Sequence, residues 1–503
     1  MSGDEDVLRS AAAGAHVIRG TLWRVGANLG GIAVGIGTAA LLLRHLGVAG
    51  SGRYVTVLSL VAVPVAVAET GLNAAAGSEL ALRSGAERAA LLQNVLGQRL
   101  LVAPVGVAAP VLFALAAGYP QSMVIGSALA GAGVMIAAIA SALLLGRLVE
   151  LRNVPFALFE LSRQVVTLAG VALLVARGAA LTPFFAVQIL SGGLALALVP
   201  LLAGRAALIA PRFERSAQRQ LLAKGLPVAA ALVLGQLYFR FVILLMSLIA
   251  SARQTGYFGG SLRAMEPLVM APVLVAQVAI PLLSAAARED RERLRYALRG
   301  LGEGAVIAGA LVILVASRAA APVIALIGGA RFRPAGAVLS IQVVALLFIA
   351  LYQLWTGALI ALGRQRELIA TNAVALAGVG CFAAILVPAL GARGGALASV
   401  LGDALLASMI YWRVRRATGP VMVGAPFLAR VLGAAAPASA ILAFSPLGGI
   451  ASALLAALVF VAAGLGIGMF PPELRAAISA GALRSRSTPA GDRTASDTLT
   501  ARP

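Results

Sequence analysis

Charged residues that interrupt long apolar stretches are the side chains of this sequence best suited to chemistry. A charge inside a membrane-spanning segment is costly, so each one is a candidate for function. Arginine binds phosphate through paired hydrogen bonds, and a carboxylate balances it or binds a cation. Each such charge in this sequence is therefore a hypothesis for function, in which an arginine would hold an anionic group and a carboxylate a cation. The candidates are Arg24, Glu69, Glu160, Arg163, Arg240, Arg263, Glu266, Arg318 and Asp403.

Two pairs of these residues share a helix face. Glu160 with Arg163, and Arg263 with Glu266, are spaced three residues apart, which places both charges on one side of a helix. Each pair is either a structural ion pair within the bundle or part of a charged cavity wall.

Glu69 and Asp403 have no charged partner in their own segments. Each either binds a coupling ion, H⁺ or Na⁺, or pairs with an arginine on another helix.

Other chemistries lack the residues they require. Cys381 is the single cysteine, and His16 and His45 are the two histidines, so no metal site and no disulfide framework is expected. No phosphate-binding loop of the Gly-x-x-x-x-Gly-Lys-[Ser/Thr] type occurs, which argues against ATP hydrolysis. We expect no enzyme activity and no cofactor apart from the H⁺ or Na⁺ that coupling would use.

The composition predicts an all-α polytopic membrane protein. Apolar residues make up 60% of 503 positions, charged residues only 12%, and the mean hydropathy is +0.96. A soluble domain needs about twice that share of charge to solvate its surface. Apolar runs of about 20 residues, the length that crosses a bilayer, predict fourteen transmembrane helices: 20–43, 54–77, 95–118, 122–146, 154–176, 182–203, 226–250, 258–284, 304–328, 337–361, 367–390, 394–412, 426–445 and 447–469.

The basic residues predict the orientation of these helices. The formal net charge is +21, but the arginines lie in short gaps between apolar runs, as in cytoplasmic loops, so no nucleic-acid binding is expected. Only seven of the 40 Lys and Arg residues fall in the alternate set of gaps: Arg44, Arg53, Arg177, Arg253, Arg331, Arg333 and Arg393. Both termini are therefore predicted to be cytoplasmic.

The chain is predicted to contain a repeat of six helices. Basic loops at 80–92 and 285–300 both suit short interfacial helices and lie about 204 residues apart. The same offset relates Gly52-Arg53-Tyr54 to Gly256-Tyr257-Phe258. Such repeats form two lobes with a substrate path between them. We expect a cytoplasmic N-terminal segment (1–19), an N-lobe (20–203), a cytoplasmic linker (204–225), a C-lobe (226–412), two further helices (426–469) and a disordered cytoplasmic tail (470–503).

These features resemble the polysaccharide-unit flippases of the multidrug/oligosaccharidyl-lipid/polysaccharide exporter superfamily. The resemblance covers roughly residues 17–415 and is a pattern of spacing and character. It is carried by Gly20-Thr21-Leu22-Trp23, Leu43 to Gly47, Gly52, Tyr54, Ser59-Leu60, Gly71-Leu72, Leu226-Pro227, Tyr238, Arg240, Gly256-Tyr257-Phe258 and Pro281-Leu282-Leu283.

The resemblance implies a protein of the bacterial inner membrane that moves undecaprenyl-diphosphate-linked oligosaccharide units to the outer leaflet by alternating access. It implies a polyprenyl-diphosphate-linked oligosaccharide as substrate, the lipid bilayer as surroundings, and a polysaccharide polymerase and glycosyltransferases as working partners. Arg24 and Arg240, in the first helix of each lobe, would line the central cavity, with Arg163 and Arg263 as further substrate-binding residues. Arg24 alternatively reaches the cytoplasmic headgroups.

Three alternatives remain. Lipid II flippases of the same superfamily have an arginine early in helix one, but the Arg-Asp pair that follows it there is replaced here by Val25-Gly26. A cation-coupled multidrug exporter would favour a cavity rich in acids. A membrane glycosyltransferase or polymerase, from a different class, would need a long extracytoplasmic loop, and every predicted outer gap is short.

Overall fold

The computed structural model describes residues 11–66, 76–77, 79–80, 82–150, 154–204 and 207–470. For residues 11–29, 149, 224–232 and 289 it describes the backbone alone. The described residues form helices joined by short turns, with no strand among them. Twelve of the described helical segments are long and apolar enough to cross a membrane. The protein is an all-α polytopic membrane protein, as its composition predicts.

The first helices form one packed group, which we call the N-bundle. Its members are α1 (Ala11–Val65), α3 (Gly85–Ala116), α4 (Gln121–Val149), α5 (Val154–Ala176) and α6 (Leu181–Ala203). α4 packs against α3 and α6, and α5 packs against α6 and α1. Close packing of α4 on α6 depends on glycines, since a Cβ at Gly133 would lie 2.2 Å from the carbonyl carbon of Gln188.

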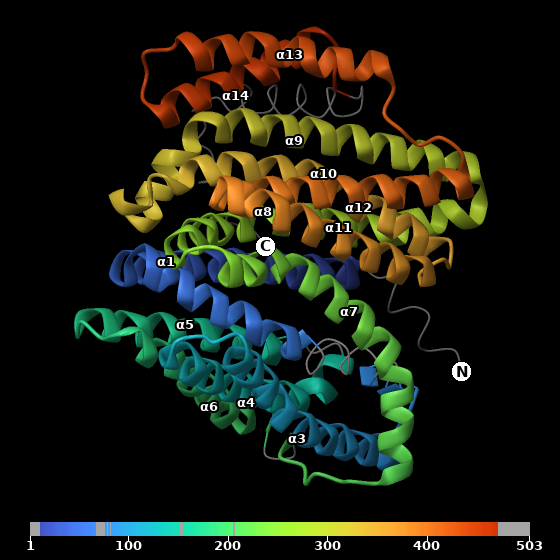
Figure 1. Cartoon of the computed structure of the whole chain (residues 1–503). Helices are drawn as coiled ribbons and strands as arrows, with labels where there is room; N and C mark the ends of the chain where they lie inside the picture. Colours follow the sequence, from blue (N-terminus) through green and yellow to red (C-terminus); the bar gives the residue numbers. More distant parts are fainter. Residues whose placement is uncertain are drawn as a thin grey trace, which may run out of the picture.

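The following helices form a second group, the C-bundle. Its members are α7 (Arg215–Ile249), α8 (Ala252–Glu289), α9 (Arg291–Gly328), α10 (Ala335–Ala361), α11 (Arg366–Leu390) and α12 (Ala392–Thr418), with a short 3₁₀ turn (Ala330–Phe332) before α10. Helices α13 (Ala425–Phe444) and α14 (Gly449–Gly466) pack against α9 on the outside of this bundle (Figure 1).

The observed helices follow the predicted spans with four larger differences. α3 begins at Gly85, before the predicted start at 95, so part of the predicted interfacial segment at 80–92 is continuous with this helix. The span predicted at 20–43 and the first part of the span predicted at 54–77 are joined in α1, which ends at Val65 and bends at Gly47, where φ is +66°. Residues 67–75 of the second span lie outside the described ranges. α7 begins at Arg215, before the predicted start at 226, so the first turns of this helix occupy part of the predicted linker. α9 begins at Arg291, before the predicted 304, so part of the predicted interfacial segment is continuous with the spanning helix.

The remaining predicted segments lie partly outside the described residues. Backbone of the predicted N-terminal segment is helical from Ala11 onward, while residues 1–10 and the tail from 471 lie outside the described ranges.

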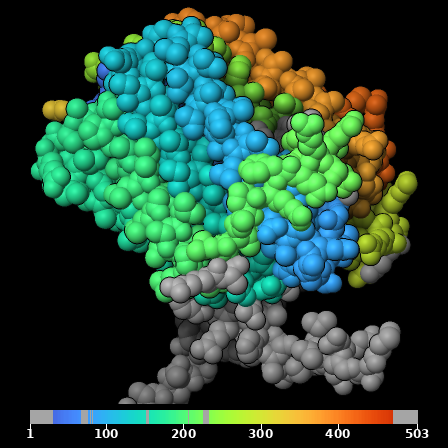
Figure 2. Space-filling model, turned by 90° about the horizontal axis from the view of Figure 1, so that it is seen from below, coloured from blue at the N-terminus to red at the C-terminus, as the bar shows by residue number. Residues whose placement is uncertain are grey.

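The two bundles meet through α1, α7 and α8. α1 packs along α8, and one hydrophobic core joins residues of α1, α7, α8 and α10, including Val57, Ile243 and Phe258. In Figure 1 the helices of the two bundles lie close at the left and diverge toward the right, where α7 crosses from one to the other. Figure 2 shows the molecule from the N-bundle side, with green α7 residues beside the blue helices.

Candidate functional site

Three charged residues of α7 and α8 form a connected cluster, the Arg–Glu–Arg triad. Arg240 Nη1 lies 2.9 Å from Glu266 Oε1, and Arg263 Nη1 lies 3.0 Å from Glu266 Oε2. One carboxylate therefore bridges two guanidinium groups, and the triad keeps a surplus positive charge. The Nε atom of Arg240 is buried and has no hydrogen-bond partner within the described part of the chain.

The triad lies where the C-bundle faces α1. The side chains of Arg240, Arg263 and Glu266 keep 17–25% of their surface accessible, so they are neither sealed in the core nor spread on the lipid-facing surface. The Tyr54 side chain of α1 is close enough to Arg263 to interact with its charge. An anion that reached this position would meet arginine donors instead of hydrocarbon.

The second predicted pair forms apart from the triad, on α5. Arg163 Nη1 lies 3.2 Å from Glu160 Oε2, and the Arg163 guanidinium carbon lies 5.9 Å from the centre of the Phe159 ring. The Glu160 side chain is 46% exposed, which weakens this pair relative to a buried one. Beside it, the Gln164 amide oxygen is buried without a partner among the described residues.

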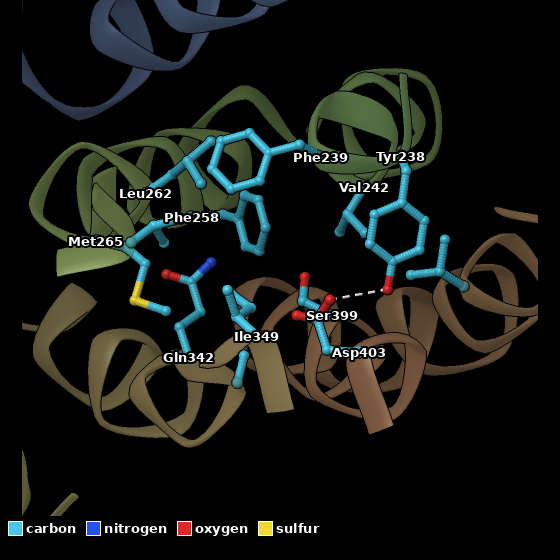
Figure 3. A pocket seen from close by; sticks show the side chains of 13 residues that line it. Tyr238, Phe239, Val242, Phe258, Leu262, Met265, Gln342, Ile349, Ser399 and Asp403 are labelled. Carbon is cyan, nitrogen blue, oxygen red and sulfur yellow. Dashed lines mark hydrogen bonds between the residues drawn. The ribbon is translucent and has the colours of Figure 1, made fainter. Parts of the chain in front are cut away.

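Asp403 occupies a separate polar site inside the C-bundle. The Tyr238 hydroxyl on α7 donates a hydrogen bond of 2.9 Å to Asp403 Oδ1 on α12, and Figure 3 shows the two side chains pointing toward one another. They border a cavity with about 40 Å³ open to the centre of a water molecule. Gln342 and Ser399 also line it, among mostly apolar neighbours.

This volume excludes an oligosaccharide and suits a few water molecules, since one water needs roughly 10–15 Å³ of the same measure. The Gln342 amide oxygen is already used, because it accepts a hydrogen bond of 2.7 Å from Ser261. Asp403 is therefore the principal charged group of the cavity.

Helix α7 connects the two polar sites. Tyr238 and Arg240 are two residues apart, which places their side chains about 200° apart around the helix axis. One face of α7 therefore presents Tyr238 to α12, and the other presents Arg240 to Glu266 on α8. A rotation or bend of α7 would change both sites together.

The bundles touch closely at the end of the molecule that carries the α7–α8 turn. A Cβ at Gly52 of α1 would lie 2.6 Å from the Ala252 carbonyl oxygen, and one at Gly256 of α8 would lie 1.9 Å from the Val48 carbonyl oxygen. Each glycine thus meets the residue four positions before the other glycine. The 204-residue offset found in the sequence relates the two contacts, since it converts Gly52 into Gly256 and Val48 into Ala252.

Side-chain hydrogen bonds reinforce this end, which we call the sealed end. Arg44 Nη2 on α1 donates to the Leu326 carbonyl at 2.6 Å, and Tyr119 and Ser247 share a hydrogen bond of 2.5 Å. Both link the N-bundle to the C-bundle. The sealed end is the one that the distribution of basic residues predicts to be extracytoplasmic.

At the opposite end a linker ties α7 to the N-bundle. The Glu214 amide donates to Asn94 Oδ1 at 3.1 Å, and Gln218 Nε2 donates to the Asn94 carbonyl at 2.8 Å. α7 therefore starts on α3 and ends inside the C-bundle.

The structure brings together three of the eight predicted site residues in the triad, and pairs two more, Glu160 and Arg163. Asp403 pairs with a tyrosine. Arg24 lies in α1, and its side chain is not among those described. Glu69 lies outside the described residues. Arg318, which the sequence also singled out, donates to the Leu442 carbonyl of α13.

Two partnerships of the site were not predicted from the sequence: the link from Arg240 to Glu266, and Asp403 as the acceptor of the Tyr238 hydroxyl. The second had a signal, since a tyrosine two residues from an intramembrane arginine puts a hydroxyl on the opposite helix face.

Comparisons with known proteins place the fold. No protein-family model and no curated protein sequence matches the chain. Among solved structures, the lipid II flippase MurJ in its inward closed conformation aligns with a TM-score of 0.73 at 14% identity, covering 89% of this chain and 98% of MurJ. An inward-facing multidrug resistance MATE family transporter of the MOP superfamily aligns at 0.63 with 15% identity, covering 78% and 94%.

A MOP superfamily transporter from Pyrococcus furiosus aligns with a TM-score of 0.53 at 16% identity, covering 78% of this chain and 95% of the other. At these identities the likeness concerns the fold. The chain has the fold of the MOP superfamily transporters.

Proposed function

We propose that this chain is a flippase that moves polyprenyl-diphosphate-linked oligosaccharides, built on undecaprenyl diphosphate, from the cytoplasmic to the outer leaflet of the bacterial inner membrane. The observation that carries this proposal is the Arg–Glu–Arg triad, in which Arg240 and Arg263 share Glu266 in a transporter fold. Surface polysaccharide biosynthesis would use such a cargo.

The charge of the triad favours an anionic cargo. Two guanidiniums against one carboxylate leave one positive charge, and a diphosphate is an anion that can take guanidinium donors from the carboxylate. Exchange of partners avoids leaving a charge unpaired in a low-dielectric region, which would cost several kcal/mol. In this proposal the arginines pair with Glu266 when no cargo is bound, and the same arginines bind the diphosphate of the cargo.

The contacts between the bundles support alternating access. The sealed end blocks one side of the membrane through the Gly52 and Gly256 contacts, while the helices diverge toward the other end. We propose that the headgroup enters from the diverging, cytoplasmic end, that both termini lie on that side, and that the lipid tail stays in the bilayer. Separation of the sealed end would then release the headgroup outside.

We propose that Asp403 responds to the coupling ion, H⁺ or Na⁺. Its cavity has room for a small ion and water but not for the cargo. Because Tyr238 of the same cavity and Arg240 of the triad both lie on α7, neutralisation of Asp403 would reach the cargo site through this helix. Arg163 and Glu160 would form a second charged wall in the N-bundle.

The alternatives differ in the charge of their substrates. A multidrug exporter of cationic compounds would meet repulsion from the surplus charge of the triad. Lipid II carries the same diphosphate group as the proposed cargo, so it remains the alternative closest in chemistry. We propose that glycosyltransferases and a polysaccharide polymerase are separate enzymes that work with this chain.

Transport by the purified protein tests the proposal. In proteoliposomes, the protein should move a fluorescent undecaprenyl-diphosphate oligosaccharide between leaflets, measured by protection of the fluorophore from an impermeant quencher. Lipid II and a cationic dye serve as competing substrates. Movement of the dye without movement of either diphosphate lipid would refute the proposal. A preference for lipid II would make lipid II the cargo in place of the oligosaccharide lipid.

Deletion of the gene provides the cellular test. Lipid-linked repeat units should accumulate in the inner leaflet and surface polysaccharide should fall. Intact surface polysaccharide without such accumulation would also refute the proposal.

A further inference from the structure

We propose that the end of the C-bundle opposite the sealed end carries a binding surface for anionic phospholipid headgroups. We call it the arginine rim and define it by the exposed residues Arg288, Arg291, Arg299, Arg366, Arg415 and Arg416. This surface is separate from the triad and does not depend on the proposed cargo.

The rim gathers the ends of four helices. Arg288 ends α8, Arg291 and Arg299 begin α9, Arg366 begins α11, and Arg415 and Arg416 end α12. A shared hydrophobic core holds these ends together.

That core contains Leu294 and Leu298 of α9 and Ile410 and Val414 of α12, each at most 1% exposed. The helix ends are therefore fixed relative to each other, and the arginines project from one rigid platform.

Local contacts confirm how close these ends are. A Cβ at Gly419, directly after α12, would lie 3.3 Å from Arg295 Nη1 of α9. Arg413 of α12 lies 3.0 Å from Glu367 of α11. Positive charge from three helices thus converges within a single patch.

The local charge exceeds what internal ion pairs can neutralise. Residues 288–303, 364–367 and 412–416 contain ten arginines against five carboxylates, a net charge of +5. Three of the carboxylates form ion pairs: Glu292 with Arg295, Glu303 with Arg299, and Glu367 with both Arg364 and Arg413. Arg291, Arg415 and Arg416 remain exposed on the rim and are available for an external anion.

Two exposed aromatic residues place the rim at a membrane surface. Tyr296 is 76% exposed and Trp412 is 51% exposed. Tyrosine and tryptophan concentrate at the boundary between hydrocarbon and water. Arg416 stacks on Trp412, with its guanidinium carbon 3.4 Å from the ring centre. Stacking fixes the guanidinium plane and leaves its N–H edge to bind a phosphate.

Together these features favour a lipid phosphate as the anion over a soluble one. Basic clusters beside spanning helices bind anionic lipid headgroups, with about a fivefold gain in affinity for each Lys or Arg near the surface. The amphipathic start of α9 lies at the same level, with Leu294 and Leu298 inward and Arg291 and Tyr296 outward.

Lipid binding to the purified full-length protein tests this inference. In mixed micelles, native mass spectrometry would measure retained phosphatidylglycerol against phosphatidylcholine. The wild type should retain the anionic lipid preferentially. Combined Arg291→Gln, Arg415→Gln and Arg416→Gln should weaken phosphatidylglycerol binding by about 100-fold, at roughly fivefold for each arginine.

The opposite end of the molecule supplies a matched control. Arg331, Arg333 and Arg393 are exposed in the same bundle, and their combined change to Gln should leave the lipid preference intact. Arg291→Gln alone, at the exposed start of α9, should give a measurable part of the loss if the triple variant does not fold.

Equal retention of both lipids by the wild type, or an equal loss in the control variant, would overturn the inference. Displacement of phosphatidylglycerol by millimolar inorganic pyrophosphate would assign the rim to a soluble phosphate compound and likewise overturn it.

Discussion

Tyr238 of α7 donates a hydrogen bond of 2.9 Å to Asp403 of α12, inside a cavity of the C-bundle. The bond holds α7 against α12 at a point two residues before Arg240. Arg240 is the arginine that shares Glu266 with Arg263. Under the proposed coupling, an ion or proton that changes the charge of Asp403 would act on the helix that carries Arg240 of the triad. A single helix, α7, would therefore be enough to connect the two sites.

Asp403→Asn should uncouple transport from the ion gradient. The amide retains the shape and an acceptor for the Tyr238 hydroxyl, but it cannot gain or lose the negative charge. Transport in proteoliposomes should stop responding to an imposed H⁺ or Na⁺ gradient, while downhill exchange of cargo continues. An unchanged response to both gradients would remove Asp403 from the coupling role.

Tyr238→Phe should destabilise the C-bundle. The change leaves the Asp403 carboxylate without its donor, and such a loss costs about 1–3 kcal/mol of unfolding free energy. Unfolding of the detergent-solubilised protein by a denaturing detergent would measure it. Tyr296→Phe is the control, since this tyrosine is 76% exposed. Equal effects of the two changes would contradict a specific role for the hydrogen bond.

The triad should show strong energetic coupling between Arg240 and Glu266. Glu266→Gln leaves two guanidiniums without their carboxylate and should destabilise the protein by about 3–5 kcal/mol. Adding Arg240→Gln should recover part of this loss, giving an interaction free energy of about 0.5–3 kcal/mol in a double-mutant cycle. Additive effects of the two changes would show that the two side chains do not act together.

Transport separates the functional role of Arg240 from its structural role. Arg240→Ala should abolish complementation of a deletion strain while the amount of protein in the membrane stays normal. Arg163→Ala, which affects the partly exposed pair on α5, should reduce complementation less. Full complementation by Arg240→Ala would exclude this residue from the cargo site.

Gly256→Ala should open the sealed end. The new Cβ would lie 1.9 Å from the Val48 carbonyl oxygen, so the bundles must move apart, at a cost of about 1–3 kcal/mol to the sealed state. Ser51 is 2% exposed, and a Ser51→Cys probe in a Cys381→Ser background should become reactive toward an impermeant maleimide.

Gly35→Ala provides the comparison for this experiment, because a Cβ at Gly35 of α1 meets nothing within 4 Å. The probe should stay protected in that variant. Protection that persists in Gly256→Ala would show that this contact does not seal the protein.

Arg318→Gln should loosen α13 from α9. Arg318 Nε donates to the Leu442 carbonyl at 2.7 Å, near the end of a helix whose last carbonyls have no partner within the helix itself. Amide hydrogen exchange should increase in the last turns of α13 and in the following turn. Arg331→Gln, an exposed arginine elsewhere in the C-bundle, should leave exchange in α13 unchanged.

Hydrophobic length carried most of the information about the fold. The predicted span 154–176 coincides with α5, and the predicted 337–361 differs from α10 by two residues at its start. α3, α7 and α9 begin earlier than the predicted spans because their first turns are polar. The sequence predicted short interfacial helices at 80–92 and 285–300 but not their continuity with the spans that follow, and it assigned 204–225 to a linker. Hydropathy detects burial in lipid and not helix formation in water.

The candidate site could be predicted only within single helices. The three-residue spacing of Arg263 and Glu266 fixed their pairing, and the structure contains that ion pair at 3.0 Å. Arg240 and Asp403 found their partners on other helices. Such partners depend on how each helix is rotated against its neighbours. The spacing of residues along a single sequence does not reveal that rotation.

The contact between Gly52 and Gly256 has the form of a twofold dimer interface in which each partner contributes the same residue. Each glycine faces the position four residues before the other, and the offset of 204 residues relates Gly52 to Gly256 and Val48 to Ala252. In a precursor of half the length, a single glycine would have sealed two identical copies against each other. Fusion of the copies would have left both glycines under the same steric constraint, while the rest of each half became free to diverge.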